Sequence, residues 1–88
     1  MRESKIEAAL VWRIRRLKGE CIKVGTEGWP DRVVILPGGE TFWIELKSEV
    51  GKLKPHQVRR FNRLLELEHE VLMLNSIAAI HKQFPMRP

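Results

Sequence analysis

Residues 28–47 read GWPDRVVILPGGETFWIELK, and the architecture of the whole chain follows from this segment. Two runs rich in β-branched and apolar residues, 31–36 and 41–47, flank a proline-glycine-glycine turn at 37–39, which predicts an antiparallel hairpin. Both faces of this hairpin are apolar, so helices must cover both, and the fold class expected is an α/β layered domain. Alternation divides the apolar residues into one face with Val33, Ile35 and Trp43, and another with Val34, Leu36, Phe42, Ile44 and Leu46.

The turn also fixes a register that brings two acids together. If Leu36 pairs with Glu40, continuing the pairing outward places Asp31 directly opposite Glu45. Facing carboxylates, with Cβ atoms about 4.5–5.5 Å apart, destabilise a sheet unless a cation lies between them. A divalent ion held by hard oxygen ligands meets this need, and alternation puts Lys47 on the same face as Glu45. An exposed strand edge with scattered surface charges is the alternative explanation of the same spacing.

The rest of the chain supplies the covering layers. Helical apolar spacing predicts helices over residues 3–18, 55–68 and 77–83, and short apolar runs predict strands over 20–24 and 70–74. Gly19 is expected to end the first helix. The expected order is therefore α-β-β-β-α-β-α, in a single domain spanning residues 1–88.

The first predicted helix carries two acids near the hairpin. Glu3 and Glu7 lie one turn apart, at the edge of the apolar stripe that holds Leu10 and Ile14. An acid in such a place is either a solvated first-turn residue favoured by the helix dipole or a carboxylate that reaches the hairpin's acids.

The second predicted helix has an apolar side and a basic side. Gln57 lies one turn before Phe61 on the apolar side, whereas the arginines form a ridge that is either solvated surface or a phosphate contact. The expected buried stripe is Val58, Phe61, Leu64 and Leu65, and the basic ridge is Arg59, Arg60 and Arg63.

Composition narrows the class of protein. A net charge of +5 over 88 residues favours a polyanionic partner such as nucleic acid. The chain has a single cysteine, Cys21, and lacks both an apolar run long enough for a membrane span and a signal-like N-terminus. These features predict an intracellular, cytoplasmic protein without a membrane partner. The three histidines have no zinc-ligand spacing, and no phosphate-binding glycine-rich loop predicts a nucleotide cofactor.

The order of these residues resembles the signature of the virus-type replication-repair nuclease (VRR-Nuc) domain, a branch of the PD-(D/E)xK nuclease superfamily, in its stand-alone phage or bacterial type. The resemblance covers nearly the whole chain and implies a restriction-endonuclease-like core with a mixed central sheet flanked by helices. Trp29 departs from the family, which usually has a smaller aliphatic residue before the Pro-Asp pair. The matching segments are Gly28-Trp29-Pro30-Asp31-Arg32, Pro37-Gly38-Gly39, Ile44-Glu45-Leu46-Lys47 and Gln57.

The resemblance implies a metal site and the residues that form it. Asp31 and Glu45 would be the carboxylate ligands of Mg²⁺, for which Mn²⁺ would substitute, and the backbone carbonyl of Leu46 would be a further ligand. An acid of the first helix would complete the site; Glu7 is preferred because it lies closer to the apolar stripe, with Glu3 as the alternative.

Two further residues match catalytic positions of the family. Lys47 would activate or position the attacking water and offset charge on the phosphate, and Gln57 would orient Lys47 or the water at the edge of the site. The residues expected to contact nucleic acid are Lys52, Lys54, Arg59, Arg60, Arg63 and Trp29.

These roles together predict a Mg²⁺-dependent, structure-selective DNA endonuclease. Bare single-domain relatives resemble junction-resolving nucleases, so a homodimer that cleaves four-way (Holliday) junctions in replication, recombination or repair is expected. A nuclease acting on flaps, nicks or duplex DNA is the second reading, and a non-catalytic DNA-binding module is the third.

Overall fold

The computed structural model describes residues 1–87. Its elements follow the expected order α-β-β-β-α-β-α, with ends within about two residues of the sequence prediction. They are α1 (Glu3–Arg16), β1 (Glu20–Lys23), β2 (Arg32–Ile35), β3 (Thr41–Leu46), α2 (Pro55–Glu66), β4 (Glu70–Leu74) and α3 (Ile77–Gln83).

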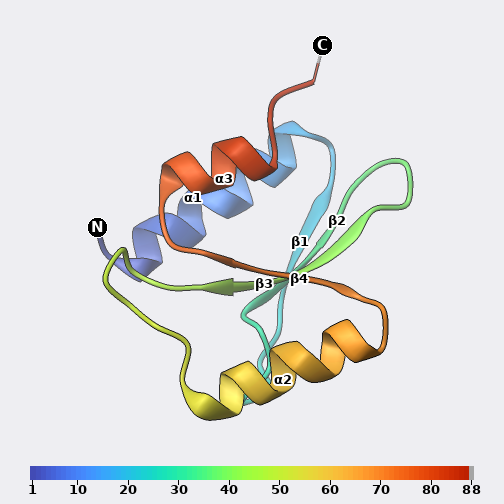
Figure 1. The fold of residues 1–88 in the computed structure, drawn as a ribbon. Helices are drawn as coiled ribbons and strands as arrows, with labels where there is room; N and C mark the ends of the chain where they lie inside the picture. Colours follow the sequence, from blue (N-terminus) through green and yellow to red (C-terminus); the bar gives the residue numbers. More distant parts are fainter. Residues whose placement is uncertain (88) are drawn as a thin grey trace.

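The four strands form one mixed sheet in the order β1-β2-β3-β4. The first three strands are antiparallel, and β4 pairs in parallel with β3 after the chain crosses over through α2. Helices α1 and α3 lie on one face of this sheet and α2 lies on the other (Figure 1). The prediction of an α/β sheet covered on both faces is therefore confirmed.

The register of the β2–β3 hairpin is the predicted one. Arg32 pairs with Ile44, and the Leu36 N–H donates to the Glu40 carbonyl oxygen at 2.8 Å. The next pair outward, just beyond the end of β2, is Asp31 with Glu45. Gly38 and Gly39 of the turn have φ of 94° and 90°, a region that glycine enters without steric cost.

The main core lies between the sheet and the α1–α3 layer. The face predicted to carry Val34, Leu36, Ile44 and Leu46 packs there, and these side chains are all nearly inaccessible. Phe42, on the same face, packs edge-on against Phe84 with ring centroids 5.3 Å apart. The helices contribute Ile6, Leu10, Ile14 and Ile80 to this core.

Helix α1 ends at Arg16, slightly earlier than predicted, and Gly19 has a different role from the expected one. Lys18, with φ of 67°, is the residue that takes the left-handed conformation. A Cβ at Gly19 would lie 2.5 Å from the carbonyl oxygen of Ile35, so Gly19 is needed for close approach of the chain to β2.

Helix α2 is rolled relative to the prediction. Leu64 is buried and Phe61 half-buried, but Val58 and Leu65 are 41% and 54% exposed, so the predicted stripe is wrong at two positions. The half-buried side of the helix includes Gln57 and Arg60 instead. This roll brings Gln57 to Glu45 and Arg60 to the ring of Trp29.

Within residues 1–87, no helix combines the length and apolar character needed to cross a membrane.

Candidate active site

The centre of the candidate site is the carboxylate of Glu45, at the end of β3. Glu45 is only 3% exposed, and its Oε2 accepts from Gln57 Nε2 at 3.0 Å and contacts Lys47 Nζ at 3.1 Å. Burial raises the pKa of Glu45, and the negative charges of Asp31 and Glu3 raise it further, against the lowering effect of Lys47. The repulsion means that this carboxylate does not stabilise the fold; the surrounding structure holds it in place.

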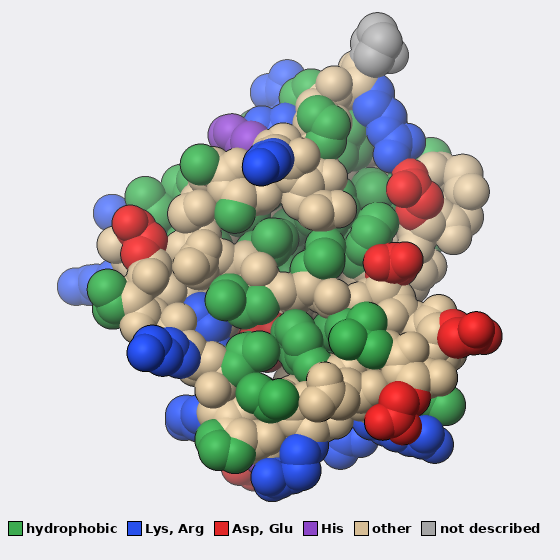
Figure 2. All heavy atoms as spheres, in the orientation of Figure 1, with side chains coloured by type: hydrophobic (Ala, Val, Ile, Leu, Met, Phe, Trp, Pro, Cys, Tyr) green, Lys and Arg blue, Asp and Glu red, His purple; other side chains and the backbone are tan. Residues whose placement is uncertain are grey.

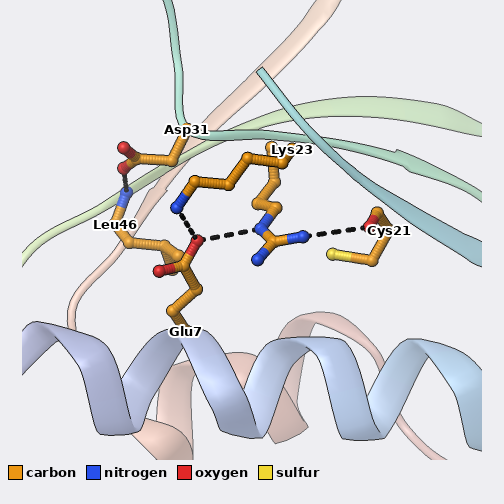
Figure 3. Close-up of polar contacts among 6 residues, drawn as sticks. Glu7, Cys21, Lys23, Asp31 and Leu46 are labelled. Atoms are coloured by element: carbon orange, nitrogen blue, oxygen red, sulfur yellow. Dashed lines mark hydrogen bonds and ion pairs between the residues drawn. The ribbon is translucent and has the colours of Figure 1, made fainter. Parts of the chain in front are cut away.

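Asp31 lies beside Glu45, where the register places it. Its Oδ2 accepts a hydrogen bond from the Leu46 N–H at 2.8 Å, which links the residue before β2 to the last residue of β3 (Figure 3). The charge of Asp31 acts on the pKa of Glu45, as expected for two carboxylates facing each other. The sequence-predicted pair is therefore brought together.

Gln57 joins the first turn of α2 to this pair. Its Oε1 accepts from the N–H of Lys54, the N-cap residue of α2, at 2.9 Å, while its Nε2 donates to Glu45. Pro55 at the beginning of the helix fits this arrangement because its missing N–H needs no partner there.

Glu7 takes part in a different cluster, on the opposite face of the sheet. Its Oε2 contacts Lys23 Nζ and Arg32 Nε, both at 2.9 Å, and Arg32 also donates to the Cys21 carbonyl oxygen at 3.2 Å (Figure 3). Burial raises the pKa of Glu7, but the hydrogen bonds from Lys23 and Arg32 outweigh it and the pKa is lowered overall. The contacts of Glu7 are thus those of a residue that ties α1 to β1 and β2.

Glu3 affects the candidate site through its charge. Its charge contributes to the raised pKa of Glu45. The start of α1 is held near the loop after β3, because the Met1 amino group contacts Glu49 Oε1 at 3.3 Å. Of the two acids of α1, Glu3 is the one whose charge raises the pKa of Glu45.

The predicted nucleic-acid contacts divide into two groups. Lys52 and Lys54 are exposed on the loop between β3 and α2, and Arg59 and Arg63 are exposed on α2. Trp29 and Arg60 are half-buried and stacked, with the Arg60 Cζ 4.3 Å from the ring centroid of Trp29.

Two residues near the candidate site have contacts that were not predicted from the sequence. Arg32 alternates with the buried Val34 and therefore faces α1, where a charge needs a partner; this parity was the signal for its pairing with Glu7. His56 lies beside Gly28, where a Cβ would be 3.7 Å from the imidazole Cδ2, and no sequence spacing indicated it.

The donor set suits a hard divalent cation. Residues 1–87 contain no group of three or more His, Cys, Asp or Glu side chains positioned to hold a metal. Two carboxylates do lie together, however, and Lys47 is in contact with only Glu45 of the two. Carboxylate oxygens are the ligands preferred by Mg²⁺, which takes one or two of them and keeps several waters. The two carboxylates are therefore chemically suited to a hard divalent cation.

The Glu7 cluster gives a stability prediction. Glu7→Gln is expected to lower the free energy of unfolding by about 1.5–3 kcal/mol, the range for hydrogen bonds to charged groups. Because the pKa of Glu7 is lowered from 4.5, this contribution is complete above that pH and disappears as the pH falls through the lowered folded-state value. Urea unfolding of both proteins at pH 7 and at acidic pH measures the difference.

The control for this prediction is Glu20→Gln, an exposed position on β1. It should leave the unfolding midpoint unchanged. A Glu7→Gln protein as stable as the parent at neutral pH would show that the cluster contributes nothing.

Comparisons with known proteins agree with this fold. No family model matches the chain. A protein named "Putative nuclease p44", of Acyrthosiphon pisum secondary endosymbiont phage 1, is 39% identical over 79 residues, covering 86% of this chain and 85% of that protein. A solved structure described as a VRR_NUC domain superposes with a TM-score of 0.85 at 31% identity, covering 91% of this chain and 90% of that one.

The mixed sheet, its helical layers and the paired acids define a restriction-endonuclease-like nuclease fold. The chain belongs to the VRR-Nuc family of nucleases. The resemblance seen in the residues from Gly28 to Gln57 is thereby confirmed.

Proposed function

We propose that this chain is a metal-dependent DNA endonuclease that hydrolyses phosphodiester bonds. The observation that carries the proposal is the meeting of Asp31, Glu45, Lys47 and Gln57 at one end of the β2–β3 hairpin, with Glu45 almost wholly buried. A buried carboxylate next to a second one contributes repulsion to the fold, so its presence is better explained by function than by stability.

Asp31, Glu45 and the Leu46 carbonyl would hold Mg²⁺, with Mn²⁺ as a substitute. The bound ion would neutralise the charge of the phosphate and lower the pKa of the attacking water. Glu3 is the α1 acid we assign to this site, because its charge acts on Glu45, whereas the Oε2 of Glu7 is occupied by Lys23 and Arg32.

Lys47 and Gln57 would act on the reacting groups. The Nζ of Lys47 lies next to Glu45 Oε2. From this position the Lys47 ammonium would donate a hydrogen bond to a non-bridging phosphate oxygen as negative charge develops there. Gln57 would keep Glu45 oriented, because its amide is fixed between that carboxylate and the Lys54 N–H.

The proposed substrate is branched DNA, and the proposed active form is a homodimer in the cytoplasm. A net charge of +5 favours binding to the phosphate backbone. Hydrophobic side chains gather on the face that Figure 2 shows. Val58 and Leu65 of α2 and Met73 of β4 are exposed, and within residues 1–87 the outer edge of β4 has no partner strand. Such a surface is suited to a second copy of the chain, which would give two active sites for two strands.

Cleavage of a labelled four-way junction and of a linear duplex with the same sequence tests this function. The protein with Mg²⁺ or Mn²⁺ is expected to cut the junction at paired positions, faster than the duplex, and to cut neither substrate in EDTA. Light scattering of the same sample is expected to give about twice the mass of one chain.

Each outcome separates the alternatives. Equal cutting of duplex, flaps or nicked DNA would identify a nuclease of broader substrate range. Salt-dependent binding without metal-dependent cutting on any substrate would favour a non-catalytic DNA-binding module and overturn the enzymatic proposal.

A further inference from the structure

A hollow lined by arginines lies on α2, on the same side of the sheet as Glu45. Its volume is about 520 Å³, and it opens between the helix and the loop that precedes β2. It is lined by Glu27, Gly28, His56, Arg59, Arg60 and Arg63.

The position of Arg60 in this hollow is fixed by two tryptophans. The rings of Trp43 and Trp29 lie with centroids 5.3 Å apart, and the Arg60 guanidinium lies over Trp29 at 4.3 Å. The Nε of Arg60 is buried, and no atom of residues 1–87 accepts a hydrogen bond from it. The ring stack therefore holds Arg60 in place without a hydrogen bond from Nε, and the rest of its guanidinium lines the hollow.

The charges around the hollow leave it positive. Arg63 contacts Glu66 at 3.4 Å, but the two side chains are 60% and 66% exposed, so this pair is weak. Glu27 is an acid on the rim, against three arginines. A planar guanidinium carries several N–H groups in a geometry that matches two oxygens of a phosphate.

The hollow and the candidate active site both take residues from α2. His56 of its lining precedes Gln57, which donates to Glu45. With a rise of 1.5 Å per residue, Arg60 and Arg63 lie about 4.5 and 9 Å further along the helix axis than Gln57. For a duplex whose axis runs parallel to α2, with an axial rise of about 3.4 Å per nucleotide of one strand, this span corresponds to roughly one to three nucleotides.

We propose that this hollow binds a phosphate of the DNA backbone one to three nucleotides from the scissile phosphate. It thereby fixes the position of the cut relative to the bound strand. Arg59 and Arg63 hold the phosphate from the helix, and Arg60, held over the ring of Trp29, adds its positive charge to the same hollow. The inference rests on the proposed function, because it assumes that the strand crossing the hollow is the one that is cut.

The double substitution Arg59→Gln with Arg63→Gln tests the site, since both residues are exposed on α2 and their loss should not affect folding. The matched control is Arg15→Gln with Arg16→Gln, which removes two exposed charges from α1 on the other face of the sheet. Fluorescence anisotropy of a labelled four-way junction measures binding at several salt concentrations, independently of cleavage.

The hollow variant is expected to weaken binding about tenfold, as for the loss of a hydrogen-bonded charged contact. The magnitude of the slope of log K against log salt should fall by about 0.9, the value for one phosphate contact. The control is expected to change affinity less than threefold. Hollow and control variants with equal affinities and equal slopes would overturn the inference, even if the protein cleaves DNA.

Single methylphosphonate linkages in the DNA locate the phosphate. For the parent protein, one uncharged linkage one to three nucleotides from the mapped cut should weaken binding, and for the hollow variant the same linkage should have no further effect. Additive losses at every position would overturn the site. Absence of any cleavage by the parent would overturn the proposed function, while the salt slopes would still report on the hollow.

Discussion

Replacing Asp31 with Asn is expected to lower the rate of DNA cleavage by about 100- to 1,000-fold while leaving the chain at least as stable as the parent. The substitution removes one of the two carboxylates that would hold the metal. It also removes a negative charge that raises the pKa of Glu45. The Asn side-chain oxygen can still accept from the Leu46 N–H, as Asp31 Oδ2 does at 2.8 Å.

Cleavage rates with saturating Mg²⁺ and urea unfolding curves measure the two effects on one preparation. Glu20→Gln is the matched control, because it also neutralises an acid, at an exposed position on β1 away from the pair. Cleavage by Asp31→Asn at the rate of the parent would remove Asp31 from the active site. A loss of both activity and stability would instead assign Asp31 a structural role.

The second large effect is expected from Lys47→Met, which keeps the length of the side chain but removes its charge. Lys47 is 12% exposed and lies 3.1 Å from a carboxylate that is itself buried. Removing one partner of a buried pair leaves an uncompensated charge and costs about 3–5 kcal/mol; the Gln57 hydrogen bond places the expected loss near 3 kcal/mol. Cleavage should fall by about 100-fold or more.

Lys47→Arg separates the two roles of this residue. Arginine keeps the positive charge for Glu45 but has a different shape and does not give up its proton. We expect most of the stability to return in urea unfolding, with cleavage still well below that of the parent. Full activity in Lys47→Met would show that the amine takes no part in the reaction.

The hairpin and its register could be predicted because they depend on local signals. The turn residues at 37–39 fix the pairing, and pairing then places Asp31 opposite Glu45 without knowledge of the rest of the fold. Alternation was equally sufficient for Lys47, which contacts Glu45 from the same face.

The roles of the two α1 acids could not be separated by helical spacing alone. Glu3 and Glu7 occupy the same side of α1, and spacing does not tell how far along the sheet each one lies. Arg32 distinguishes the two acids, because it faces the same helical layer as Val34 and forms an ion pair with Glu7. The charge of Arg32 on a buried face was visible in the sequence and was the missing clue.

The roll of α2 had a different cause. Its apolar pattern predicted Val58 and Leu65 as buried, but both are exposed. The helix turns instead so that Gln57 and Arg60 meet Glu45 and Trp29. Contacts between polar side chains and a ring stack outweigh the apolar pattern here, and such long-range contacts cannot be read from periodicity.

The amide of Gln57 makes the start of a helix and the state of a carboxylate interdependent. It accepts from the Lys54 N–H and donates to Glu45 at the same time, so opening of the first turn of α2 would also remove this hydrogen bond to Glu45. Helix ends open more readily than the middle of a sheet. The orientation of Glu45 is therefore coupled to the fraying of one helical turn, and substitutions in the loop before Pro55 are expected to affect Glu45 without touching it.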